Sequence, residues 1–286
     1  MLARVDDPSL TMRARHFAAL VFDARGRPVE AERLLREALA LATRAGSPTF
    51  LATVQSALAL PVLRLGRLDE GEALLRESLA LFERIGSAHN VARVLNSLAL
   101  VALWRAGSAD AATAARDASR AVELFDRMGY SFAKHQALDT LGQAMAALGR
   151  FDEARQCFEE AATVGAPAIK AEAWFHLALL DLELKRVADA TRIADRLLEL
   201  ALTQGSDPVK RWATLLGAAI ALRVEPDSRM ARRWLVALLA DQDLDFELRQ
   251  RADALLALSQ APAAPAFAGQ PEDLLDELRR FLRRQS

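Results

Sequence analysis

The sequence predicts an all-α protein: a solenoid of five to six antiparallel helix pairs, followed by two further helices. Its composition is 52% hydrophobic but only 6% aromatic, and Ala, Leu and Arg, which all favour helices, dominate it. Glycines recur at nearly constant intervals, and the apolar residues between them follow helical spacing without any alternation of period two. One pair of amphipathic helices cannot bury its apolar faces alone, whereas stacked pairs share a continuous core.

A first series of glycines marks the turn inside each predicted pair. Its members are Gly26, Gly66, Gly107 and Gly149, spaced by 40, 41 and 42 residues. Lys185 continues the series after 36 residues, and Arg223 or Glu225 opens a weaker sixth copy. The short interval implies that the second helix of the fourth pair lacks about one turn.

A second series of glycines ends each pair. It consists of Gly46, Gly86, Gly129, Gly165 and Gly205. Glycine is the usual residue in the left-handed conformation that ends a helix. The residues that follow are typical of helix starts: Ser47-Pro48, Ser87, Ser131, Pro167 and Asp207-Pro208. We expect the Ser and Asp side chains to cap free N–H groups and the prolines to occupy the first turn.

The predicted solenoid covers residues 1–242, and three segments follow it. Residues 243–260 form a helix that covers the last pair, 261–270 an Ala/Pro linker, and 271–286 an amphipathic helix. The apolar stripe of this last helix consists of Leu274, Leu275, Leu278, Phe281 and Leu282. The stripe suits either folding back onto the solenoid or recognition of a partner, including self-association through Leu274, Leu278 and Phe281.

The fourth predicted unit, ALDTLGQAMAALGRFDEARQCFEEA, resembles a tetratricopeptide repeat (TPR). The matching positions are Leu141-Gly142 at the helix crossing, Gly149 at the turn, and Phe151, Ala154, Phe158 and Ala161 in the second helix. Trp174 and Trp212 resemble the start of the family's first helix in the next two units. Over roughly residues 9–240 the resemblance implies a right-handed solenoid whose first helices line a concave face. The period of about 40 residues is longer than the usual 34. It is similar to the arrays of bacterial transcriptional activators, signalling ATPases and peptide-pheromone receptors.

Several kinds of chemistry find no support in the residue pattern. The glycines do not form a phosphate-binding loop, and the four histidines His16, His89, His135 and His176 are too far apart for a local metal motif. We therefore expect no catalytic residues, cofactor or metal, although an enzyme site assembled across repeats stays open. The 37 basic and 38 acidic residues are interleaved, which disfavours nucleic-acid binding.

The localisation expected from the sequence is cytoplasmic. The N-terminal residues are charged where a signal peptide is apolar, and the longest apolar runs reach about half of the ~20 residues that a membrane span needs. The single cysteine, Cys157, favours a reducing compartment. It falls in an apolar column beside acidic residues, so we expect it to be buried, with a raised thiol pKa.

These exclusions leave recognition of a protein or peptide segment. Positions facing the implied groove, counted from each turn with the spacing of the family, are Arg13, His16, Thr53, Ser56, Arg93, Asn96, Gln136, Asp139, Gln143, Glu172 and Phe175. Amide side chains can hold a peptide backbone, Arg93 can pair with a carboxylate, and Phe175 can serve as an apolar anchor. The leading hypothesis is a non-enzymatic binding scaffold or adaptor. The alternative is a sensor module of a bacterial transcription or signalling system, with the C-terminal helix as its autoinhibitory or dimerisation element.

Overall fold

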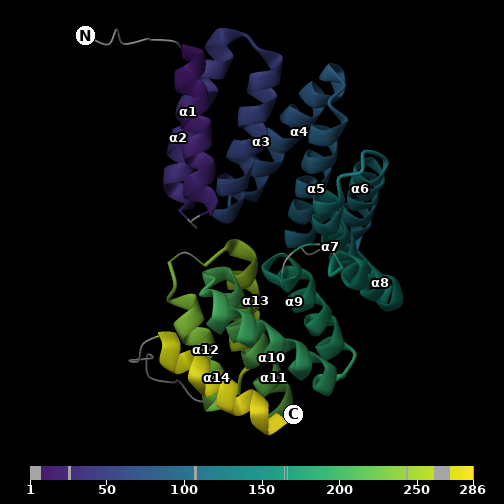
Figure 1. Cartoon of the computed structure of the whole chain (residues 1–286), viewed down its shortest axis with the longest axis vertical. Helices are drawn as coiled ribbons and strands as arrows, with labels where there is room; N and C mark the ends of the chain where they lie inside the picture. Colours follow the sequence, from purple (N-terminus) through teal and green to yellow (C-terminus); the bar gives the residue numbers. More distant parts are fainter. Residues whose placement is uncertain are drawn as a thin grey trace, which may run out of the picture. The chain divides into compact units, whose positions relative to one another are not determined.

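The computed structural model describes residues 8–24, 27–105, 108–163, 165, 167–242, 244–260 and 271–285. These residues form fourteen α-helices and, within the described ranges, no strand (Figure 1). The contacts divide the chain into two compact units, 1–130 and 131–286. The glycine pattern did not predict this division.

Unit 1 contains three helix pairs. They are α1 (Pro8–Ala24) with α2 (Pro28–Ala45), α3 (Pro48–Arg64) with α4 (Leu68–Ile85), and α5 (Ala88–Trp104) with α6 (Ser108–Arg127). Each helix contacts the next one along the chain, as the solenoid prediction requires. One core cluster joins α1, α2 and α3 through residues such as Met12, Leu35 and Leu58, all at most 1% exposed.

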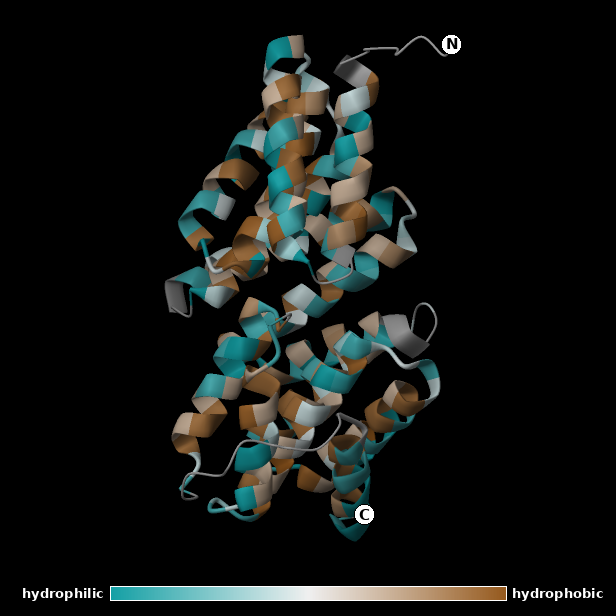
Figure 2. Cartoon of the chain, turned by 90° about the vertical axis from the view of Figure 1, so that its left-hand side faces the viewer, coloured by the Kyte–Doolittle hydropathy of each residue, from teal (hydrophilic) through white to brown (hydrophobic). Residues whose placement is uncertain are grey.

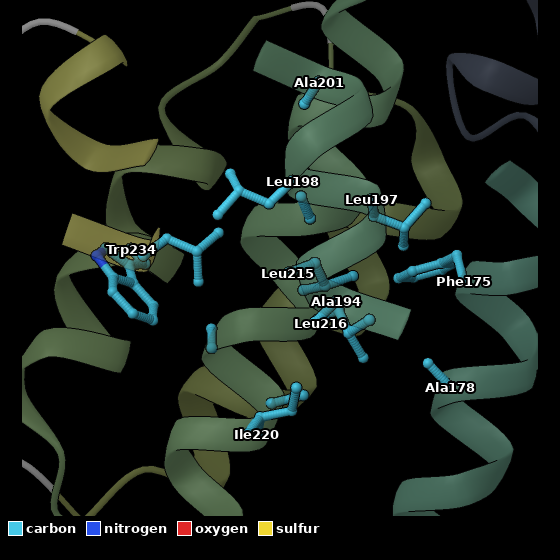
Figure 3. Packing of buried hydrophobic residues seen from close by; sticks show 14 of the residues in the cluster. Phe175, Ala178, Ala194, Leu197, Leu198, Ala201, Leu215, Leu216, Ile220 and Trp234 are labelled. Atoms are coloured by element: carbon cyan, nitrogen blue, oxygen red, sulfur yellow. The ribbon is translucent and has the colours of Figure 1, made fainter. Parts of the chain in front are cut away.

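Unit 2 continues with three more pairs and two additional helices. They are α7 (Ser131–Ala147) with α8 (Phe151–Ala161), α9 (Pro167–Glu183) with α10 (Val187–Gln204), α11 (Asp207–Val224) with α12 (Arg229–Leu239), then α13 (Phe246–Leu258) and α14 (Pro271–Gln285). In the core, residues of α11 such as Leu215 lie between Phe175 of α9 and Trp234 of α12 (Figure 3). The six pairs confirm the predicted all-α solenoid.

Hydrophobic and hydrophilic residues are interspersed along the helices (Figure 2). Among the described helices, none is long and apolar enough to cross a membrane. Pro61 lies inside α3, three residues before its end.

The glycine series has the predicted conformation. Positive φ angles occur at Gly46, Gly66, Gly86, Gly129, Gly149, Gly165 and Gly205. Lys185 takes the glycine position of its turn with a φ of 61°, and it is the one other described residue with positive φ. Gly26 and Gly107 lie outside the described residues.

Helix starts differ in part from the prediction. Ser47 and Ser87 occupy N-cap positions, but neither side chain accepts a capping hydrogen bond, and the N-cap of α11 is Ser206 rather than Asp207. Side-chain caps form instead at Ser228 and Asp245. The predicted serines therefore stabilise their helices less than expected.

The fourth pair owes its geometry to two features of the sequence. Helix α8 has 11 residues against 18 in α2, α4 and α10, which confirms the predicted shortening and exceeds it. At the crossing of α7 with α8, a Cβ atom on Gly142 would lie 2.6 Å from Cε1 of Phe158. Glycine therefore lets the two helices approach closely, as the resemblance implied.

The last two helices cover the end of unit 2. Helix α13 packs on α11 and α12, and α14 packs on α10 and α11. Leu274, Leu278 and Phe281 are at most 7% exposed, and Phe281 lies edge-on against Trp234 at 5.7 Å. The expectation of self-association through this stripe is therefore wrong for this structure, because the chain's own core buries it. Residues 261–270, the predicted linker, lie outside the described residues.

Candidate functional site

The predicted groove residues of unit 1 lie on the first helices of its three pairs. Arg13 and His16 are on α1, Thr53 and Ser56 on α3, and Arg93 and Asn96 on α5. The hydroxyls of Thr53 and Ser56 donate to backbone carbonyls of their own helix, at 2.8 Å to Thr49 and 3.0 Å to Thr53. These two residues are therefore less available to a ligand than predicted. Arg13 is exposed, and His16 is half-buried.

Arg93 is an exposed cation that no carboxylate of the described residues pairs with. Its one side-chain hydrogen bond runs to Oδ1 of Asn90 at 3.5 Å, and the surrounding protein lowers its pKa by desolvation. Most other arginines of unit 1 that face a neighbouring helix are paired; Arg64, for example, reaches Asp23 at 3.1 Å. Among the described residues, Arg93 is thus a positive charge without a carboxylate partner.

The charge of Arg93 acts on two histidines. The pKa of His16 and that of His89 are both lowered, first by burial and then by Arg93. His89 lies on α5 with Arg93, but His16 lies on α1, two helix pairs away along the chain. Arg93 on α5 is therefore within electrostatic range of His16 on α1.

Two further polar groups on α5 have unfilled hydrogen-bonding capacity. Oδ1 of Asn96 and Nδ1 of His89 are buried without a hydrogen-bond partner in the described structure. His89, Arg93 and Asn96 are spaced i, i+4, i+7, so they share one side of the helix. We call these three residues the α5 stripe. Buried polar atoms are nearly always hydrogen-bonded, so these two atoms are exceptions among the described residues of α5.

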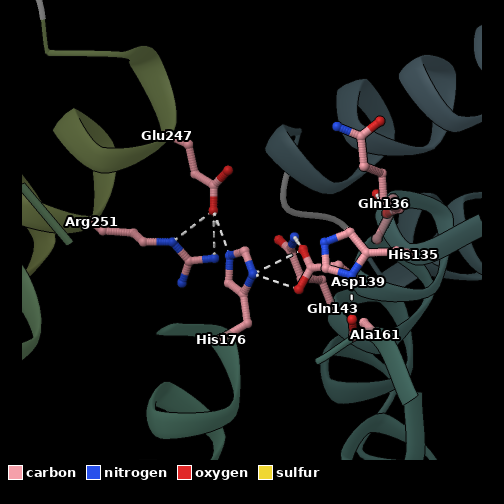
Figure 4. Close-up of polar contacts among 9 residues, drawn as sticks. His135, Gln136, Asp139, Gln143, Ala161, His176, Glu247 and Arg251 are labelled. Carbon is pink, nitrogen blue, oxygen red and sulfur yellow. Dashed lines mark hydrogen bonds and ion pairs between the residues drawn. The ribbon is translucent and has the colours of Figure 1, made fainter. Parts of the chain in front are cut away.

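In unit 2 the predicted residue Asp139 contacts His176, which was not among the predicted site residues. Asp139 of α7 lies 2.9 Å from Nδ1 of His176, and Glu247 of α13 lies 3.3 Å from its Nε2 (Figure 4). Arg251 binds Glu247 from the other side at 2.9 Å. Together with Glu172 these residues form the His176 cluster.

The charge state of His176 follows from its partners. Since both ring nitrogens face carboxylates, both must donate, and the ring is an imidazolium. Burial alone would lower the pKa of His176, but Asp139 and Glu247 outweigh burial and raise it to about 10. Burial would likewise raise the pKa of Glu247, while Arg251 and His176 hold it far below its usual range.

Glu172 makes none of the described hydrogen bonds of this network, although it lies four residues before His176 on the same side of α9. Burial raises its pKa to about 7, with Asp139, Glu247 and Asp245 adding to the rise and His176 opposing it. Glu172 is therefore a carboxyl group that takes up a proton near neutral pH.

The remaining predicted residues have different surroundings. Gln143 donates from Nε2 to Oδ2 of Asp139 at 3.1 Å, and Gln136 is exposed. Phe175 is 1% exposed and stacks on Trp212 in the core, so the expectation of an apolar anchor in the groove is wrong. The inward-facing residue of this turn is its neighbour His176, one position beyond the predicted register.

Cys157 is half-buried, where full burial was expected. Burial, followed by the charges of Glu160, Glu153 and Asp139, raises the pKa of its thiol to about 11. Within the part of the chain that the structure describes, no group of three His, Cys, Asp or Glu side chains is arranged to hold a metal ion.

Comparisons with known proteins agree with this architecture. The tetratricopeptide repeat model matches residues 135–164, the helix pair α7–α8. No curated protein matches the sequence significantly. Among solved structures, a Rap protein complexed with Competence and Sporulation Factor has a TM-score of 0.70 and 15% identity, covering 98% of this chain and 78% of the other.

Two further structures share the fold. The Rap conjugation gene regulator of the plasmid pLS20, in complex with the Phr* peptide, has a TM-score of 0.66 and 13% identity, covering 91% of this chain and 78% of the other. A signal transduction ATPase with numerous domains and a tetratricopeptide repeat sensor, from Pyrococcus horikoshii, has a TM-score of 0.57 and 16% identity. That match covers 95% of this chain and 44% of the ATPase. The chain therefore has a TPR-like fold and carries a tetratricopeptide repeat at residues 135–164.

Proposed function

We propose that this TPR-like array is a non-enzymatic scaffold that binds a peptide or protein segment on the first helices of unit 1. The observation that carries the proposal is the α5 stripe, where an unpaired guanidinium lies beside two buried polar atoms without partners. A folded chain that needed no ligand there would be expected to satisfy these groups internally.

The ligand chemistry follows from the three side chains. The guanidinium of Arg93 offers a planar set of donors that suits a carboxylate, either of an acidic side chain or of a C-terminus. Oδ1 of Asn96 can accept an N–H of the ligand backbone, and its amide group can donate to a carbonyl. An extended acidic segment therefore matches the stripe.

The structural neighbours support a peptide ligand without identifying it. Two proteins of the same fold were solved with a peptide or a factor bound, the Phr* peptide and Competence and Sporulation Factor. At 13% and 15% sequence identity to this chain, these structures support the fold but not the identity of a ligand. The proposal that the peptide binds to unit 1 rests on the α5 stripe.

The proposal is tested by screening the full-length protein against an array of short synthetic peptides, each made with a free and with an amidated C-terminus. We expect acidic peptides to bind, and the Arg93→Ala variant to lose roughly tenfold or more in affinity, as for a charge-assisted hydrogen bond. Arg84→Ala removes an exposed arginine from α4 and serves as the matched control. Equal binding by both variants would assign the ligand to another surface.

A sensor module of a larger signalling system is the second candidate. The sensor-bearing ATPase has the same fold over 95% of this chain, which supports this reading. In that case the peptide bound at the α5 stripe would act as a signal, and a second protein component would respond to it. Co-purification of such a component that depends on the peptide would distinguish the sensor from a simple scaffold.

A further inference from the structure

Of the two added helices in unit 2, α13 has fewer buried residues than α14. Only Leu248 and Ala252 of its 13 residues are buried, and Leu258 is 74% exposed. In contrast, five apolar residues of α14 lie in the core. A polar contact joins α13 to α9: Glu247 accepts from Nε2 of His176 at 3.3 Å (Figure 4).

His176 has a second acceptor within reach on its own helix. Glu172 precedes it by four residues, the spacing at which an acidic and a cationic side chain pair along a helix. Asp139 already holds Nδ1, so Glu172 and Glu247 compete for Nε2 alone. Each arrangement satisfies the imidazolium, but only the pairing with Glu247 connects His176 to α13.

We propose that His176 is a two-position latch: paired with Glu247 it holds α13 on α9, and paired with Glu172 it releases the start of α13. Release would uncover the face of α7 and α9 that carries Asp139, Gln143 and Glu172, which are positions predicted to face a ligand. The inference extends the proposed function to unit 2, and it does not depend on the α5 stripe.

The latch depends on pH in a defined direction. The ionisable groups that act on Glu172 are Asp139 on α7, His176 on α9, and Asp245 and Glu247 at the start of α13. Burial among these groups raises the pKa of Glu172 to about 7. When α13 is released, Glu172 pairs with His176 and its pKa falls toward or below 4.5, the ordinary value. The closed form therefore binds one more proton between these pKa values, and a rise in pH favours release.

The test is amide hydrogen exchange of the full-length protein at pH 5.5 and 7.5, corrected for the intrinsic rate at each pH. Proton linkage predicts that protection of α13 falls by on the order of tenfold at the higher pH. Helix α14 is the internal reference and should keep its protection. A parallel loss in α14 would show general loosening of unit 2 and would overturn the latch.

Three variants separate the two positions of His176. In Glu172→Gln, α13 stays protected at both pH values because the competing carboxylate is gone. In Glu247→Gln, α13 is poorly protected at both. Asp253→Asn changes an exposed carboxylate of the same helix and should behave as the wild type. A Glu172→Gln protein that keeps the full pH response, or a Glu247→Gln protein that keeps α13 protected, contradicts the proposal.

Discussion

At the scale of single residues, the two units differ in whether the charged side chains of the candidate site have partners. Arg93 in unit 1 has no carboxylate partner among the described residues, whereas His176 in unit 2 has two. A buried charge is tolerated when it is paired and hydrogen-bonded, so the His176 cluster is stable without a ligand. An unpaired arginine gains most from an incoming anion, which is why we assign the ligand to unit 1.

The electrostatic effect of Arg93 on His16 can be checked by histidine titration. Since Arg93 adds to the effect of burial in lowering the pKa of His16, the Arg93→Ala variant should show a higher His16 pKa. NMR of the ring protons measures this directly, with Arg84→Ala as the control that leaves His16 unchanged. An unchanged His16 in Arg93→Ala would mean that Arg93 lies outside electrostatic range of His16.

Cys157 gives a second prediction at this scale. With a thiol pKa of about 11, the thiolate is a small minority at pH 8, so alkylation should be slow in the native protein. The rate should rise as the pH approaches 11 and should also rise on unfolding in urea. Equal rates for the native and unfolded thiol would show that neither burial nor the neighbouring acids protect it.

At the scale of helices and turns, glycine decides how closely the paired helices approach. Gly142 leaves room for Phe158, which is 1% exposed and cannot move aside without disturbing the core. Lys185 is an exception to the use of glycine in the turns, because it holds a left-handed conformation that glycine holds in the other turns. These positions were predictable because one residue type and its spacing determine the local geometry.

The Gly142→Ala variant should therefore destabilise unit 2. Alanine is the better helix former by about 1 kcal/mol, but its Cβ would overlap Phe158, and overpacking typically costs about 1–3 kcal/mol. We expect a net loss in the free energy of unfolding measured with urea. An Ala147→Gly substitution, at the exposed last residue of the same helix, is a control for an exchange of alanine and glycine away from the crossing. If Gly142→Ala proves as stable as the wild type, the crossing is looser than described.

At the scale of the whole molecule, the repeat pattern predicted five to six helix pairs and two added helices, and the structure has six pairs and both added helices. It predicted less of the candidate site, for two physical reasons. A shift of one residue rotates a helical side chain by about 100°, so a small error in register exchanged Phe175 for His176. The pairing of His176 with Glu247 spans 71 residues and joins a repeat to a helix outside the array, which no repeat spacing encodes. The division at residue 130 also has no counterpart in the repeat pattern.

The central claim is that the first helices of unit 1 bind a carboxylate-bearing peptide. The most direct measurement is a two-dimensional NMR titration of the full-length protein with the tightest peptide of the array. The account predicts shifts in the side chains of Arg93 and Asn96 and in amides of α1, α3 and α5, while the exposed sides of α2, α4 and α6 stay unchanged. Shifts confined to the second helices, or saturable binding that leaves Arg93 and Asn96 unaffected, would contradict it.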